Sequence, residues 1–143
     1  MLARADQMAC SKSVRLTPVR RRSLEILLES HKAMGAYDLL ERLDAEGLGS
    51  KPVVAYRALD FLTKHGLAHR IEGLNAFVAC AHPDETHTPA FLVCQACRTV
   101  AEAEIAAETG ELSDVTRDLG FQVKRTVIEA LGLCADCQNT APA

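Results

Sequence analysis

Apolar residues recur at helical spacing in the first half of the chain. The clearest case is the segment AYDLLERLDAEG, where they fall at i, i+3, i+4 and i+7 as a stripe on one helical face: Ala36, Leu39, Leu40 and Leu43. Upstream, Thr17 offers a capping hydroxyl and Pro18 suits a first helical turn, so a helix is predicted to begin there. These two segments predict two amphipathic helices.

A third helix is predicted over KPVVAYRALDFLTKHG, with Ser50 as its cap, Pro52 in its first turn and Gly66 at its exit. Its apolar stripe is Ala55, Ala58, Leu59 and Leu62. The complementary face presents Tyr56 and Arg57 in the N-terminal half, where a recognition helix enters the major groove of DNA. Arginine can bond guanine twice, and tyrosine can pack on a thymine methyl or bond a phosphate. A solvated charged face without a DNA-binding role is the alternative that this helix alone leaves open.

The next segment, LAHRIEGLNAFVAC, alternates apolar and polar residues and has a turn signal at residues 72–75. It predicts a β-hairpin in which residue 71 lies opposite 76, 69 opposite 78 and 67 opposite 80. Three helices followed by a two-stranded wing are typical of a winged-helix domain. The hairpin therefore favours DNA binding over the solvated-face alternative.

The second half predicts a smaller unit of strand, helix and strand, at residues 99–105, 112–119 and 121–129. The fold class that follows is α+β, with an N-terminal winged helix-turn-helix domain followed by a small α/β domain. The boundaries that we expect are 1–80 for the DNA-binding domain with its N-terminal arm, 81–89 for a hinge and 90–143 for the α/β domain. The arm is expected to be mobile, and Cys10 within it has no assigned role.

Charge divides the chain in the same way. Residues 1–72 carry 12 Lys/Arg and 9 Asp/Glu, whereas the remaining residues carry 4 and 10, so only the first half is suited to a polyanion. The basic residues around the start of the first predicted helix suit contacts to the DNA backbone or minor groove: Arg15, Arg20, Arg21 and Arg22. No apolar run approaches the roughly 20 residues that span a bilayer, and the first residues lack the apolar region of a secretory signal. We therefore expect a cytoplasmic protein with no membrane partner. In a reducing compartment, six cysteines indicate metal binding or thiol chemistry rather than a disulfide framework.

Four of the cysteines form two C-x-x-C pairs, which are Cys94 with Cys97 and Cys134 with Cys137. Each pair can present two thiolates from a tight turn, and two pairs complete a closed four-cysteine zinc site. The 36 residues between them must form a folded unit that brings the pairs together. A redox dithiol or labile disulfide is the alternative, although neither pair opens a helix after a βαβ-type strand.

The hairpin register points to a second metal site. It places His69 and Cys80 as diagonal neighbours on one face, roughly 7–8 Å apart at their Cα atoms and within reach of a common ion. His87 and Glu102 are the next candidates by position, with His82 competing for the place of His87. Thiolate and imidazole ligands favour zinc over a hard cation.

Five quoted stretches together carry a family resemblance that covers most of residues 15–137: RLTPVRR, AYDLLERL, KPVVAYRALDFLTKHGLAHRIEGLNAFVAC, THTPAFLVCQACRTVAE and VIEALGLCADC. The chain resembles the ferric uptake regulator family, and most of all its zinc uptake regulator branch. The resemblance implies a winged helix, a hinge and a dimerisation domain. It also implies a homodimeric repressor that binds operator DNA with an inverted repeat when it is loaded with two zinc ions (Zn2+) per chain, and that represses zinc-uptake genes.

The resemblance also assigns residues. It places a structural zinc on Cys94, Cys97, Cys134 and Cys137, and a regulatory zinc on His69, Cys80, His87 and Glu102. Preferring His87 to His82 depends on this resemblance. The DNA contacts that it implies fall on Arg15, Tyr56 and Arg57, with Tyr37 as a further contact.

Two alternatives stay open at this point. Within the family, an iron or peroxide sensor is the rival, but such sensors generally use histidine and carboxylate ligands rather than the thiolate of Cys80. From another class, a thiol oxidoreductase would use the C-x-x-C pairs. No Ser/His/Asp arrangement, phosphate-binding loop or paired-carboxylate site supports other enzyme chemistry, so we expect no enzyme and no small-molecule substrate beyond the metal ion.

Overall fold

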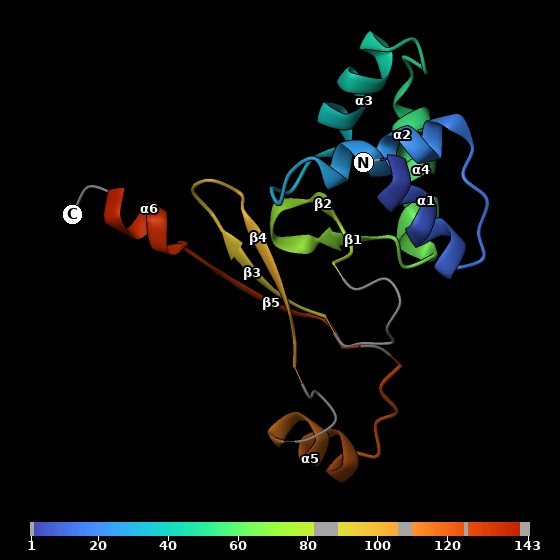
Figure 1. The fold of residues 1–143 in the computed structure, drawn as a ribbon. Coiled ribbons are helices and arrows are strands. Elements are labelled where there is room, and N and C mark those ends of the chain that lie inside the picture. Colours follow the sequence, from blue (N-terminus) through green and yellow to red (C-terminus); the bar gives the residue numbers. More distant parts are fainter. Residues whose placement is uncertain (1, 82–88, 106–109, 125, 141–143) are drawn as a thin grey trace.

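The computed structural model describes residues 2–81, 89–105, 110–124 and 126–140. In it, the first half of the chain folds into a helical domain with a β-hairpin (Figure 1). Its helices are α1 (Leu2–Ser11), α2 (Pro18–Leu28), α3 (Ala36–Ala45) and α4 (Pro52–Lys64). Thr17 caps α2 by accepting a hydrogen bond from the Arg20 amide, as predicted. The cap of α4 is Lys51 rather than Ser50, and its side chain makes no capping hydrogen bond.

The predicted apolar stripes are the ones that pack inside this domain. Leu39 and Leu43 of α3 are fully buried, as are Leu59 and Leu62 of α4. Helices α2, α3 and α4 contact one another in this core. The helical periodicity is therefore confirmed, because each stripe is the face that the neighbouring helices cover.

The N-terminal segment differs from the expected mobile arm. Helix α1 lies against α2, and its Ala5, Met8 and Ala9 are buried in the same core as the stripes of the other helices. These residues have the spacing i, i+3, i+4, which is itself a helical signal. Cys10 lies on the exposed side of α1.

The hairpin has the predicted register. Strands β1 (Ala68–Ile71) and β2 (Ala76–Ala79) are antiparallel, with Ile71 opposite Ala76 and His69 opposite Val78. The turn between them is a short 3-10 helix, η1 (Glu72–Leu74), closed by Asn75 in the left-handed conformation. The backbone amide of Cys80 donates to the carbonyl of Leu67, which extends the pairing to the end of the hairpin.

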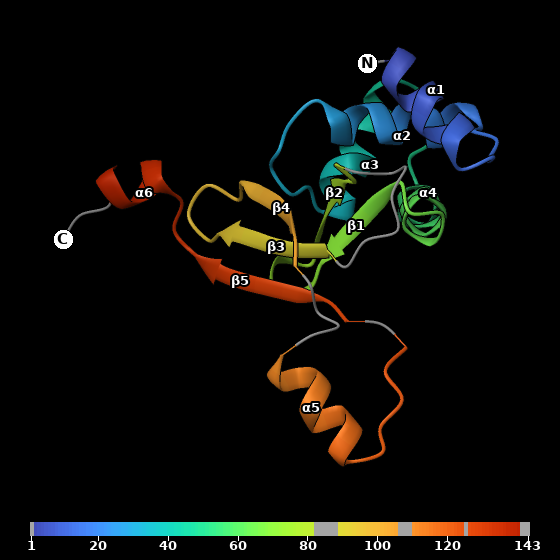
Figure 2. The same ribbon diagram turned by 60° about the horizontal axis from the view of Figure 1, so that its bottom comes forward.

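The second half forms a three-stranded sheet in the order β4-β3-β5, followed by a short helix (Figure 2). The strands are β3 (Pro89–Cys94), β4 (Val100–Glu104) and β5 (Ile128–Gly132), and the helices are α5 (Glu111–Asp118) and α6 (Ala135–Thr140). The positions of β4 and α5 match the prediction. Strand β3 was not predicted, and the expected strand at residues 121–129 is wrong for most of its length, because pairing with β3 begins only at Ile128.

A second apolar core joins the hairpin to this sheet. Ile71, Ala76 and Val78 from the wing pack with Phe91 and Val93 from β3, together with Ala33 and Val100. The loop between α2 and α3 reinforces the junction, because the amide of Ala33 donates to the carbonyl of Arg98 and the amide of Val100 donates to the carbonyl of His31. The wing thus lies between the helices and the sheet, as Figure 1 shows.

Candidate metal centres and nucleic-acid interface

The two C-x-x-C pairs meet at one end of the sheet. Strands β3 and β5 are adjacent and parallel with Cys94 paired to Gly132, so the chain after each strand leaves at the same edge. Cys94 ends β3 and Cys97 follows in the turn, while Cys134 and Cys137 follow β5. The four sulfurs lie within 4.8 Å of one another, and those of Cys97 and Cys134 are 3.8 Å apart. Thiolates about 2.3 Å from a tetrahedral zinc lie about 3.8 Å from each other, so the cluster has the dimensions of a closed zinc site.

Local electrostatics favour a cation in this cluster. Backbone hydrogen bonds from Cys134 and then from Cys97 lower the pKa of Cys94 to about 6. Hydrogen bonding to the hydroxyl of Thr99 is the main cause that lowers the pKa of Cys97, whereas hydrogen bonding with Cys134, Cys94 and Cys97 raises the pKa of Cys137 to about 12. Four neighbouring thiols cannot all ionise without electrostatic repulsion between the thiolates. A divalent cation compensates this repulsion.

A second group of ligand atoms lies where the wing meets the sheet. His69 is on β1, Cys80 follows β2 and Glu102 is on β4, and their ligand atoms lie within 4.8 Å of one another. The Nε2 atom of His69 is 3.5 Å from Oε1 of Glu102, and the sulfur of Cys80 is 3.9 Å from the same oxygen. Nitrogen and oxygen ligands about 2.0–2.1 Å from a tetrahedral zinc lie about 3.4 Å apart, so this trio also fits zinc.

Glu102 is the residue whose burial most favours a cation here. Its side chain is only 5% exposed, and its second oxygen accepts a hydrogen bond from the amide of Ala81 at 2.9 Å. The ring of His69 packs against Phe91 with 5.2 Å between centroids, which fixes the imidazole next to the carboxylate. A buried carboxylate is costly unless a positive charge or metal accompanies it. The donor set of imidazole, thiolate and carboxylate therefore matches a zinc site that joins the two parts of the molecule.

The fourth expected ligand, His87, lies outside the described residues, as does its competitor His82. Residues 82–88 connect Ala81 to β3, so this segment begins two residues after Cys80. The trio would need one more ligand from the chain to become a four-coordinate protein site.

Two of the four expected DNA-contacting residues meet where α3 approaches α4. The rings of Tyr37, at the start of α3, and Tyr56, on α4, meet edge to face with centroids 6.4 Å apart. Arg57 is exposed beside Tyr56, and Arg15 is exposed just before α2. Tyrosine and arginine on one face of a recognition helix can contact base edges and phosphates.

Three arginines at the start of α2 make intramolecular contacts that sequence reasoning missed. The guanidinium of Arg20 lies 3.7 Å above the ring centroid of Phe61, and Arg21 pairs with Asp6 of α1. Arg22 bonds the carboxylates of Glu46 and Glu25 and lies 3.6 Å from Glu29. We expected these residues to contact the DNA backbone or minor groove. The guanidinium of Arg22, however, already bonds carboxylates of its own chain.

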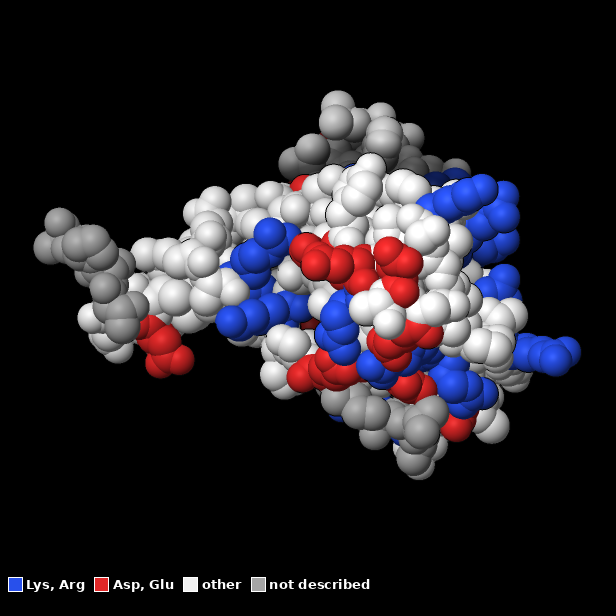
Figure 3. Space-filling view, turned by 90° about the horizontal axis from the view of Figure 1, so that it is seen from above, with Lys and Arg blue, Asp and Glu red and all other residues white. Residues whose placement is uncertain are grey.

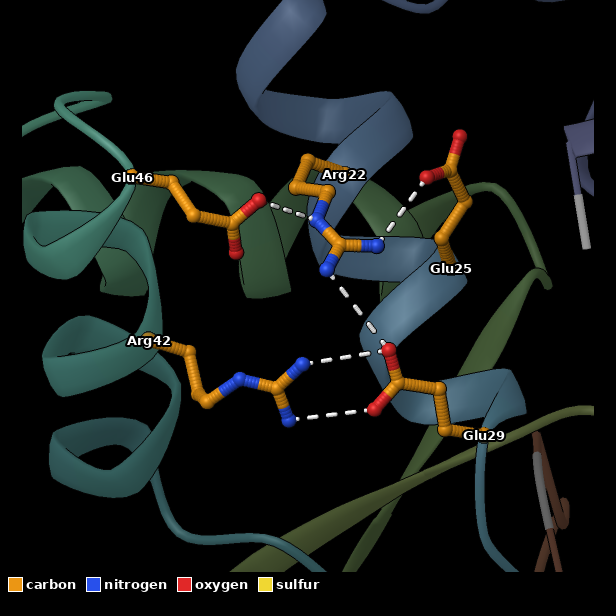
Figure 4. A network of polar contacts seen from close by, with 5 residues as sticks. All are labelled: Arg22, Glu25, Glu29, Arg42 and Glu46. Atoms are coloured by element: carbon orange, nitrogen blue, oxygen red, sulfur yellow. Dashed lines mark hydrogen bonds and ion pairs between the residues drawn. The ribbon is translucent and has the colours of Figure 1, made fainter.

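These contacts extend into a network that ties α2 to α3 (Figure 4). Arg42 of α3 donates two hydrogen bonds to Glu29 at 3.0 and 3.1 Å, while Arg22 reaches Glu46 at the end of α3 at 2.6 Å. The main cause that raises the pKa of Arg22 is its hydrogen bond with Glu46, and the main cause that lowers the pKa of Glu29 is its hydrogen bond with Arg42. Figure 3 shows acidic and basic side chains interspersed on the face seen from above. This face is therefore not a uniformly basic one.

No helix in the described ranges combines the length and the apolar character that a membrane span requires. No protein-family model matches the chain.

Regulators of zinc uptake are among the known proteins that resemble this chain in sequence and structure. The chain is 38% identical over 138 residues to the zinc uptake regulation protein of Escherichia coli (strain K12). The aligned region covers 96% of this chain and 81% of that protein. A structure of a zinc uptake regulator complexed with zinc and DNA superimposes with a TM-score of 0.87 at 37% identity, covering 97% of this chain and 93% of the other.

Two structures of one further relative show which arrangement this chain adopts. Holo XcZur matches with a TM-score of 0.84 at 34% identity, covering 97% of this chain and 99% of that one. Apo XcZur matches with a TM-score of only 0.51 at 37% identity, covering 96% and 95%. The arrangement described above is therefore closer to that of the holo relative. With this identity along nearly its whole length, the chain belongs to the ferric uptake regulator family, in its zinc uptake regulator branch.

Proposed function

We propose that this protein is a cytoplasmic, zinc-responsive repressor that binds operator DNA as a zinc-loaded homodimer and represses zinc-uptake genes. The observation that carries the proposal is the trio of His69, Cys80 and Glu102, because it joins a DNA-binding wing to a second domain through ligands that suit zinc. Family membership supports the same conclusion and argues against the thiol oxidoreductase. The proposed domains are 1–80, a hinge at 81–89 and 90–143.

The two metal sites have different tasks in this proposal. Cys94, Cys97, Cys134 and Cys137 hold a permanent zinc that keeps the ends of β3 and β5 together, because closed sites contribute folding free energy. His69, Cys80 and Glu102, with His87 as the fourth ligand, form the regulatory site. Zinc bound there supplies a positive charge that compensates the Glu102 carboxylate and the Cys80 thiolate.

The residues around the regulatory site convert ligand binding into domain orientation. His69 and Cys80 belong to the wing and Glu102 belongs to the sheet, so drawing them together fixes the angle between the two parts. When they are not held, the DNA-competent arrangement is a minority state, and the apparent affinity for DNA falls by that fraction.

DNA recognition in this proposal uses α4 and the residues around it. Tyr56 and Arg57 contact bases or phosphates in the major groove, Arg15 reaches toward the minor groove, and Tyr37 contacts the backbone. Two copies of the winged helix in a homodimer would meet successive major-groove faces of an inverted repeat. An exposed apolar stripe on α5 and its C-cap residue offers a surface for this dimer: Leu112, Val115 and Leu119.

The test is operator binding measured across buffered free zinc and free iron(II), with metal content determined on the same samples. We expect two zinc ions per chain and binding that follows zinc. His87→Ala should leave a folded dimer that keeps one zinc and no longer responds to zinc, while His82→Ala, as the matched control, should respond like the wild type.

Two outcomes would contradict parts of the proposal. Binding that follows iron(II) and not zinc would show an iron sensor. An unchanged zinc dependence for His87→Ala would show that the fourth regulatory ligand is wrong, and loss of the response in His82→Ala would transfer that role to His82.

A further inference from the structure

One transverse row of the sheet faces the wing and carries a carboxylate at each end. Phe91 on the central strand β3 is paired with Glu102 on β4 and with Glu129 on β5. Side chains of directly paired residues lie on the same face of a sheet, so all three point to the same side. Phe91 is buried in the core shared with the wing, which identifies that side as the one against the hairpin.

The two carboxylates contact opposite ends of the hairpin. Glu102 lies beside His69 and Cys80, at the end where the two strands enter and leave the wing. Glu129 reaches the turn, where Oε1 accepts a hydrogen bond from the amide of Glu72 at 2.5 Å and Oε2 accepts one from the amide of Gly73 at 3.0 Å. These hydrogen bonds join residues 57 and 56 positions apart in the chain, so they connect the two domains rather than stabilise a local turn.

The turn also fits closely against β5. Leu131 lies on the same face as Glu129, and a Cβ atom placed on Gly73 would be only 2.8 Å from Cδ2 of Leu131. The absence of a side chain on Gly73 therefore leaves room for the side chain of Leu131 where the turn meets β5. Leu74, next in the turn, packs against the shared apolar core.

We propose that Glu129 is a positioning residue that fixes the wing turn on the sheet and so sets the orientation of the winged helix for DNA binding. Strands of four residues extend about 13 Å, which separates the contact at the turn from the ligands at the other end of the hairpin. One contact alone leaves the hairpin able to pivot, whereas contacts at both ends fix its direction. A carboxylate that accepts hydrogen bonds from two backbone amides makes charge-assisted hydrogen bonds, which are stronger than neutral ones.

The position of Glu129 depends in turn on the four-cysteine cluster. Cys134 follows Glu129 by five residues, and the amide of Gln95, in the first C-x-x-C pair, donates to the carbonyl of Gly132 in β5. Strand β5 therefore has the cysteine cluster at one end and the wing-turn contact at the other. In this arrangement the cluster holds the strand that presents Glu129.

The inference rests on the proposed function, and the experiment separates the two. Wild type, Glu129→Ala, Glu129→Gln and the control Glu72→Ala are compared with zinc saturating. The control removes a carboxylate from the same turn but keeps the Glu72 and Gly73 amides that bond to Glu129. The measurements are zinc content, operator affinity and hydrogen exchange of the peptide that contains the wing turn.

We expect all four proteins to hold the same amount of zinc. Glu129→Ala should bind operator about tenfold more weakly, since the competent orientation becomes a smaller fraction of the population, and its turn amides should exchange faster. Glu129→Gln keeps one acceptor oxygen, so its operator affinity and exchange rate should lie between those of Glu129→Ala and the wild type. Glu72→Ala should keep the slow exchange and the operator affinity of the wild type.

Unchanged exchange and unchanged affinity in Glu129→Ala, with a wild type that responds to zinc, would overturn the role of Glu129. Faster exchange without loss of affinity would also overturn it, because the contact would then be structural only. A wild type that does not bind DNA in response to zinc would instead contradict the proposed function, and the exchange data would still report on the contact.

Discussion

At the scale of single residues, Glu102 and Glu129 show how one side-chain type performs two tasks. Both lie in the same row of the sheet on either side of Phe91. Glu102 meets an imidazole and a thiol, which together with it can hold a metal ion, whereas Glu129 accepts hydrogen bonds from two backbone amides. The part of the wing that lies opposite each carboxylate decides what it can bind.

A test of the Glu102 assignment is the substitution Glu102→Gln, which keeps the shape of the side chain and removes its charge. We expect the zinc content to fall from two ions per chain to one after dialysis against a competing chelator, because an amide is a poor zinc ligand. Glu104→Gln, which changes an exposed carboxylate on the same strand, should keep both ions. The fold, followed by circular dichroism, should not change in either variant. Two zinc ions retained in Glu102→Gln would contradict the assignment.

At the scale of secondary-structure elements, α4 combines a buried stripe with an exposed face that is suited to DNA. The network of Arg22, Glu29, Arg42 and Glu46 fixes α2 against α3, and both of these helices contact α4. Exposed salt bridges contribute little singly, but a connected set that includes a two-bond arginine-carboxylate pair holds geometry better. The network therefore supports the angle at which α4 presents Tyr56 and Arg57.

Arg57→Ala is the variant that tests this face. We expect operator binding to weaken by about 1–3 kcal/mol and discrimination between operator and unrelated DNA to decrease, because an arginine that bonds a base carries sequence information. Zinc content and dimerisation should be unchanged. Lys64→Ala, at the far end of the same helix, is the matched control and should discriminate as well as the wild type.

If Arg57→Ala weakened binding equally to all DNA sequences and lowered only its salt dependence, Arg57 would be a phosphate contact. Competition assays between operator and unrelated duplexes at two salt concentrations distinguish the two outcomes.

At the scale of the whole molecule, the wing packs on one face of the sheet and α5 extends away from the sheet (Figure 2). The wing covers the face that carries Phe91, while Leu92 points to the other face and is 56% exposed. The apolar stripe of α5 is exposed, and its C-cap residue Leu119 is 77% exposed. Apolar surface of this extent on a small protein is typical of a protein-protein interface, and a second copy of the chain is the partner that the proposed function requires.

Val115→Glu tests that interface, since it places a charge in the middle of the stripe on α5. We expect the variant to be monomeric in sedimentation or light scattering, and to bind a two-half-site operator much more weakly because one copy carries only one winged helix. Arg117→Ala, on the same helix, should remain dimeric. A dimeric Val115→Glu protein would show that the copies associate through another surface.

Local pattern was sufficient for the elements whose partners are close in sequence. Helical periodicity located the buried faces of α3 and α4, since the stripe needs only the adjacent helices to cover it. Alternation and a turn signal predicted the register of the wing, because the position and length of the turn set which residues of the two strands pair. The register in turn predicted that His69 and Cys80 are neighbours, and the two C-x-x-C pairs indicated a closed metal site.

Only the tertiary structure decided the features that depend on distant segments. Parallel pairing with β3 determines where β5 begins, and the surface of α2 determines that α1 docks rather than stays mobile. The sequence alone did not show that Arg22 would bond Glu46 or that Glu129 would meet the wing turn, because these partners lie 24 and 57 residues away. Sequence periodicity reports which face of an element is buried, whereas the identity of the covering segment is set by packing across the whole chain.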